Sequence, residues 1–73
     1  MNTDFLSQIE ARLPEFSKAQ KLIARYILDH YEKAAFMTAS RLGATVGVSE
    51  STVVRFASEV GCDGYPQLQK GLQ

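Results

Sequence analysis

A break of three residues separates two helical patterns in the second half of the chain. It falls at Gly47-Val48-Ser49, within the stretch "GATVGVSESTVVRFASEVG". Gly47 permits a backbone turn in which a side chain would be strained, and Ser49 can accept a hydrogen bond from an unpaired amide of the next helix. A second helix that begins so soon must cross the first steeply, so its outer face stands away from the body of the protein. We infer that this face meets a partner.

Two further residues favour a tight crossing. Gly43, four residues before Gly47, removes bulk where the two helix axes cross, and Val48 can lie between the helices. A helix, a glycine turn and a serine cap in this order are the parts of a helix-turn-helix, whose second helix enters the DNA major groove by its N-terminal residues. The sequence therefore predicts DNA binding.

Length and charge limit the class of protein. A chain of 73 residues is at most one domain and buries only roughly 60% of its unfolded surface. A small helical bundle or a dimer is therefore expected rather than an enzyme, and no cofactor is expected. Lys and Arg number 8, as do Asp and Glu, so the net charge is zero. Binding to DNA must then depend on where single charges lie.

The remaining compositional signals favour a cytoplasmic protein without a membrane partner. No apolar run approaches the ~18 residues of a membrane span, and no secretory leader is evident. Cys62 has no second cysteine with which to pair and no evident activating base. His30 has no partner at a metal-ligand spacing. We expect neither residue to form a catalytic or metal site.

The apolar spacing predicts an all-α fold, a five-helix bundle of the homeodomain-like type. Helices are expected over residues 5–13, 17–30, 38–46, 49–60 and 65–72. Pro14 discourages continuation of the first helix, and Ser17 and Thr38 can cap the second and third. The connection "YEKAAFMT" is expected to place Phe36 and Met37 in the core.

The fourth helix, residues 49–60, separates into an apolar and a polar side. At ~100° per residue, one side carries Val53, Phe56, Ala57 and Val60, and the other carries Ser51, Arg55 and Ser58, flanked by Val54 and Glu59. Such a polar side can be a plain solvated surface, but the preceding turn favours a recognition helix. The candidate DNA contacts of the domain are Thr38, Ser49, Ser51, Thr52, Val54, Arg55, Ser58 and Lys18.

Each candidate has a chemical reason. Arg55 can pair with guanine O6 and N7 or with a phosphate, and Val54 can meet a thymine methyl. Ser51 and Thr52 can bond to base edges or to backbone oxygens. Glu50 suits the helix dipole as an acid of the first turn, or it can accept from cytosine N4. Lys18, with Lys21 and Arg25, is either part of a solvated face or a contact to the DNA backbone.

The sequence also resembles a known family. "FSKAQKLIARYILDHYEKA" and "FMTASRLGATVGVSESTVVRFASEVGCDGYPQLQKGL" look like the N-terminal domain of the RpiR-type bacterial transcription regulators, and "GVSESTVVRF" is the most specific portion. The resemblance extends from about Leu13 to Leu72. It implies that residues 1–73 are the DNA-binding domain of a longer regulator of carbohydrate metabolism. A sugar-isomerase-like domain that senses a phosphosugar, absent from this sequence, would complete that regulator.

Several positions depart from the family's pattern. Cys62 stands where an aromatic residue is frequent, and Asp63 stands where a basic or small residue is usual. Gly43 replaces the usual alanine, and Ala57 and Ser58 stand where cysteine and a basic residue are frequent. The last change reduces the positive charge of the recognition helix, so Arg55 carries more of it.

The first helix leaves two interpretations open. Its apolar residues are Phe5, Leu6, Ile9 and Leu13, which either complete the core or form a homodimer interface anchored by Phe5 and Ile9. A dimer would present two helix-turn-helix units to a two-fold related site. The alternative function is a helical protein-interaction module that does not touch DNA.

Overall fold

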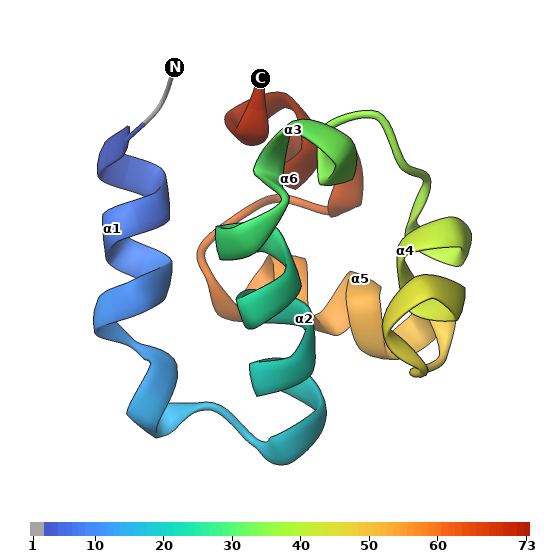
Figure 1. Cartoon of the computed structure of the whole chain (residues 1–73), viewed down its shortest axis with the longest axis horizontal. Coiled ribbons are helices and arrows are strands. Elements are labelled where there is room, and N and C mark those ends of the chain that lie inside the picture. The colour runs from blue at the N-terminus through green and yellow to red at the C-terminus, as the bar shows by residue number, and fades with distance from the viewer. Residues whose placement is uncertain (1–2) are drawn as a thin grey trace.

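The computed structural model describes residues 3–73, and the regular elements within that range are all helices. They are α1 (Thr3–Ala11), the short 3-10 helix η1 (Leu13–Glu15), α2 (Lys18–Asp29), α3 (Tyr31–Ala34), α4 (Ala39–Val46), α5 (Glu50–Glu59) and α6 (Tyr65–Leu72). In Figure 1, α1 lies on one side of α2, and α4 and α5 lie on the other. The all-α prediction is confirmed, and the single-turn α3 is added to the five expected helices.

The chain enters α2 through a reciprocal cap. The Ser17 Oγ accepts from the Gln20 amide at 3.3 Å, and the Gln20 Oε1 accepts from the Ser17 amide at 2.8 Å. This capping box satisfies two backbone donors, one of them an amide of the first turn that the helix itself cannot satisfy. Within the helix that it begins, Ile23, Ala24 and Ile27 are buried, because their helical spacing places them on one face.

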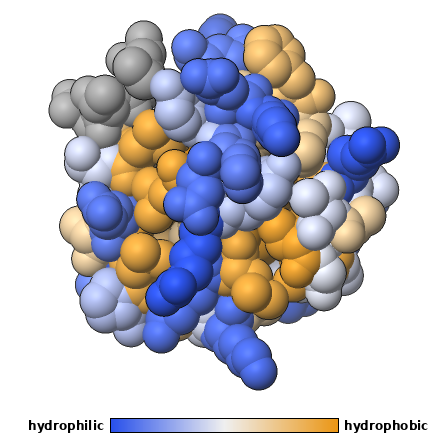
Figure 2. Space-filling view, viewed as in Figure 1, coloured by the Kyte–Doolittle hydropathy of each residue, from blue (hydrophilic) through white to orange (hydrophobic). Residues whose placement is uncertain are grey.

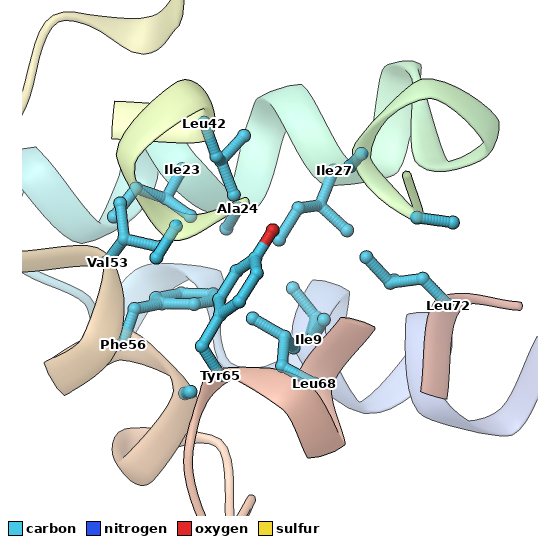
Figure 3. Packing of buried hydrophobic residues seen from close by; sticks show 14 of the residues in the cluster. Ile9, Ile23, Ala24, Ile27, Leu42, Val53, Phe56, Tyr65, Leu68 and Leu72 are labelled. Atoms are coloured by element: carbon cyan, nitrogen blue, oxygen red, sulfur yellow. The ribbon is translucent and has the colours of Figure 1, made fainter. Parts of the chain in front are cut away.

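One apolar core joins the helices (Figure 3). Its buried residues are Ile9, Phe16, Ile23, Ala24, Ile27, Ala34, Ala35, Ala39, Leu42, Val53, Phe56, Ala57, Tyr65, Leu68 and Leu72. Phe56 of α5 is fully buried, and its ring packs against that of Phe16 in an edge-to-face arrangement at a centroid distance of 5.3 Å. The recognition helix is therefore packed directly against the segment that joins α1 to α2.

The connection before α4 corrects one prediction. Phe36 is 79% exposed, so the expectation that it fills the core is wrong. Ala34, the last residue of α3, and Ala35, which follows it, occupy the inward positions, and Phe36 consequently points outward. Met37 is partly buried against the core, as expected.

A buried tyrosine fixes α6 to this connection. The Tyr65 hydroxyl donates to the Met37 carbonyl oxygen at 2.6 Å, while its ring lies in the core (Figure 3). Burial raises the pKa of Tyr65 because the charged phenolate would lose its hydration. The hydrogen bond holds the segment that leads into Thr38 and α4.

The apolar face of α1 mainly completes the core. Ile9 is 1% exposed, which corrects the expectation that it anchors a dimer. The ring of Phe5 packs over Gly71 of α6, and Leu6 and Leu13 are partly buried. Figure 2 shows apolar patches between α1 and a hydrophilic strip that follows α2. Helical spacing groups these residues on one face, but it cannot say which of them the neighbouring helices cover.

Candidate nucleic-acid interface

The turn between α4 and α5 has the conformation that its glycine predicts. Gly47 adopts φ 86° and ψ 29°, the left-handed region that side chains disfavour. The amides of Gly47 and Val48 donate to the Gly43 carbonyl oxygen at 2.8 and 2.9 Å. The Val48 bond is the longer-range bond of a Schellman motif, and the two bonds satisfy the Gly43 carbonyl in the last turn of α4. The chain can then reverse direction within three residues.

Gly43 lets the two helices meet more closely than a side chain would allow. A Cβ atom at this position would lie 2.7 Å from the Val48 carbonyl oxygen and 3.3 Å from the Ser49 carbonyl carbon. Both atoms belong to the backbone and cannot rotate away. The missing side chain therefore sets how the turn and α5 approach α4.

Hydroxyl groups gather at the N-terminus of α5. The Ser49 Oγ accepts from the Thr52 amide at 3.2 Å and caps the helix. It also lies 3.1 Å from the Ser51 Oγ and 2.8 Å from the Thr52 Oγ1. These polar groups lie where the helix dipole is positive, and this combination favours an anionic partner such as phosphate.

The outward side of α5 carries the predicted contacts. Ser51, Arg55 and Ser58 are exposed, and Val54 is 41% exposed although it is apolar. Thr52 is half-buried. A shallow hollow at this end of the helix is lined by Ser49, Glu50, Ser51, Val54 and Arg55. The opposite side of α5 is buried, as the projection predicts.

Arg55 is available to a partner. Among residues 5–73, whose side chains the structure describes, Arg12 and Glu59 form an ion pair within 4.0 Å, and Arg55 forms none. Arg55 therefore keeps its five guanidinium donors for other acceptors.

Two further predicted contacts begin other helices. Thr38 caps α4 by accepting from the Arg41 amide at 3.1 Å, and it is exposed. Lys18 is the first residue of α2 and is also exposed. Both side chains therefore lie at helix N-termini, where contact with a phosphate is favourable.

The described part of the chain offers little to a metal ion or a membrane. It contains no group of three or more metal-ligating side chains, and none of its helices is long and apolar enough to span a bilayer. Cys62 is half-buried, and burial raises the pKa of its thiol, which keeps it in the unreactive protonated form.

Two packed helices joined by a glycine turn, the second with an exposed polar side, define a helix-turn-helix DNA-binding domain. The family model described as "Helix-turn-helix domain, rpiR family" matches residues 3–73. The chain therefore belongs to the rpiR family of helix-turn-helix domains, and its function is that of the DNA-binding domain of a transcription regulator.

Two regulators are among its relatives. The chain is 38% identical to the HTH-type transcriptional regulator HexR of Pseudomonas aeruginosa over 66 residues, which are 90% of this chain and 23% of HexR. It is 33% identical to the uncharacterized HTH-type transcriptional regulator YfhH of Escherichia coli over 67 residues, which are 92% of this chain and 24% of YfhH. The chain thus spans about a quarter of the length of these relatives.

Proposed function

We propose that α5 enters the DNA major groove and reads base edges there, within a regulator of carbohydrate metabolism. The observation that carries the proposal is the exposed side of α5, where Ser51, Val54 and Arg55 surround a hollow at the N-terminal end of the helix. The N-terminal residues of a recognition helix are the ones that reach base edges.

The exposed residues divide between reading bases and holding the DNA backbone. Arg55 pairs with guanine or a phosphate, Val54 meets a thymine methyl, and Ser51 bonds to a base edge. Thr52 is half-buried and bonded to Ser49, so it suits a backbone oxygen better than a base. Ser58 lies about one turn beyond Arg55 along α5 and suits a phosphate. Lys18 and Thr38 contact the backbone from the ends of their own helices.

The test uses DNA that this domain selects from a random pool. Arg55→Ala should weaken binding in a gel-shift titration by about 1 to 3 kcal/mol without changing the circular dichroism spectrum. Lys33→Ala is the matched control, because it removes one exposed cation of α3. Unchanged affinity of Arg55→Ala would contradict the assignment.

A groove beside α1 supports a second role in self-association. It has a volume of about 300 Å³ and is lined by Phe5, Gln8, Ile9, Ala11, Arg12 and Val60. We propose that a second copy of the chain docks here and that the pair binds a two-fold related site. With Ile9 buried, the partly exposed Phe5, Leu6 and Leu13 are the remaining candidate contacts.

Sedimentation equilibrium tests this role, and the salt dependence of DNA binding tests the alternative function. If α1 mediates a dimer through this groove, the wild type associates, and a folded variant with Phe5→Asp, a change in the groove lining, associates more weakly. If the domain is instead a protein-interaction module without DNA contact, selected DNA will not bind with the steep salt dependence of phosphate contacts.

We further propose that the full regulator is cytoplasmic and senses a phosphosugar through a sugar-isomerase-like domain outside residues 1–73.

A further inference from the structure

Arg12 connects the N-terminal segment to the far end of the recognition helix. Its side chain donates through Nη1 to the main-chain carbonyl oxygen of Glu59, the last residue of α5, and its Nη2 lies 3.4 Å from the Glu59 Oε1. The guanidinium carbon also lies 5.6 Å from the centre of the Phe16 ring, which packs on Phe56 of α5. Three kinds of contact therefore hold this arginine in one place.

The backbone bond completes the end of α5. The carbonyls of Phe56, Ala57 and Ser58 accept from the amides of Val60, Cys62 and Gly61. Arg12 supplies a donor to the next carbonyl, that of Glu59, and a cation near a helix C-terminus is also favoured by the helix dipole.

The ion pair between Arg12 and Glu59 affects which partners are open to Arg55. Residues four apart on a helix are neighbours on its surface, so Glu59 is within reach of Arg55. An acid at this position can pair with the arginine that the DNA requires, and it also repels phosphate. In the structure Glu59 pairs with Arg12 instead, and Arg55 has no ion pair among residues 5–73.

We propose that Arg12 is a positioning residue for DNA binding, because it holds and neutralises Glu59 and so leaves Arg55 free to bind DNA. The proposal rests on the placement of Arg55 at the DNA given above. Arg12 itself need not touch DNA, since its guanidinium is already bonded to α5 and lies over Phe16.

A double-variant titration on selected DNA tests the proposal. Arg12→Ala should weaken binding by about threefold to tenfold, since Glu59 is then free to pair with Arg55 and faces the phosphates uncompensated. Arg12→Ala/Glu59→Gln should return to within about twofold of the wild type, because an amide neither pairs with Arg55 as an ion nor repels phosphate. Loss of a merely structural contact would not be rescued by removing its second partner.

Two controls sharpen the comparison. Arg12→Ala/Glu32→Gln removes an exposed acid of α3, which lines no part of the hollow at α5, and should remain weak, whereas equal rescue would show an unspecific effect of net charge and overturn the proposal. Lys33→Ala should bind like the wild type. Urea denaturation establishes that each variant is folded at the assay temperature. If Arg12→Ala does not fold, Arg12→Gln takes its place, because the amide can still donate to the Glu59 carbonyl although the charge is lost. It should bind more weakly than the wild type and be rescued by Glu59→Gln, and wild-type binding would overturn the proposal.

The remaining outcomes are also decisive. Arg12→Ala binding as tightly as the wild type would overturn the proposal. So would a double variant as weak as the single one, together with a salt slope reduced by about one phosphate contact, because Arg12 would then touch DNA directly. If Arg55→Ala binds like the wild type, the failure lies instead with the proposed role of Arg55.

Discussion

Replacing Gly43 with alanine has two opposite effects on stability. It improves helix propensity, and it crowds the contact between α4 and the turn. The added Cβ would lie 2.7 Å from the Val48 carbonyl oxygen, which is closer than van der Waals contact allows. The Gly43 carbonyl also accepts both amides of the turn, so the backbone on the two sides of the clash is tied together. Relief requires the turn and the start of α5 to move away from α4.

The two effects have opposite signs. Alanine in place of glycine within a helix gains about 1 kcal/mol. Crowding against a backbone that cannot rotate away costs about 2 kcal/mol, within the usual range for overpacking. We therefore expect Gly43→Ala to lower the free energy of unfolding by about 1 kcal/mol, which lowers the melting temperature of a domain of this size by about 4 to 8 °C.

Thermal and urea denaturation followed by circular dichroism measure this change. Ala44→Gly is the matched control, because Ala44 is the exposed neighbour in α4 and its replacement reports propensity alone, an expected loss of about 1 kcal/mol. Gly43→Ala should also weaken DNA binding, because α5 would be displaced. A Gly43→Ala protein that melts at or above the wild-type temperature would refute the close approach deduced from the structure.

Two more predictions concern the turn and the pinned tyrosine. Gly47→Val should lower the melting temperature although nothing lies within 4 Å of the added Cβ, because φ 86° strains a branched residue. Gly47→Asn should lower it less, because asparagine tolerates that region better. Equal melting temperatures of the wild type and both variants would show that the left-handed conformation is not needed. For Tyr65, the folded pKa is raised above the unfolded value of 10.0, so its contribution to stability is complete below pH 10 and is lost as the pH rises further. Urea titrations should show a smaller alkaline loss for Tyr65→Phe than for the wild type, and an identical loss would contradict the assignment.

The features that sequence predicts well here are local. The structure confirms the glycine turn at Gly47 and the caps at Ser17, Thr38 and Ser49. They could be predicted because each depends on hydrogen bonds within five residues along the chain. The buried and exposed sides of α5 follow from its period. The division needs no knowledge of the partner helices, because a single stripe must face the core.

Features that depend on distant neighbours escaped prediction. Phe36 points outward because Ala34 and Ala35 already occupy the inward positions. Ile9 is buried by helices that the pattern of α1 cannot locate. The contact of Arg12 with Glu59 joins positions 47 residues apart, and neither residue carries a local signal for it.

The most direct test of the account asks which groove α5 occupies. Selected DNA is prepared with 7-deazapurines, which lack the N7 acceptor of the major groove, or with inosine for guanine, which lacks the N2 amine of the minor groove. We expect 7-deaza substitution within the site to weaken wild-type binding, with a smaller further effect on Arg55→Ala wherever Arg55 reads a guanine. Inosine should change binding little. Binding that tolerates every 7-deaza substitution and is lost with inosine would contradict the placement of α5 in the major groove.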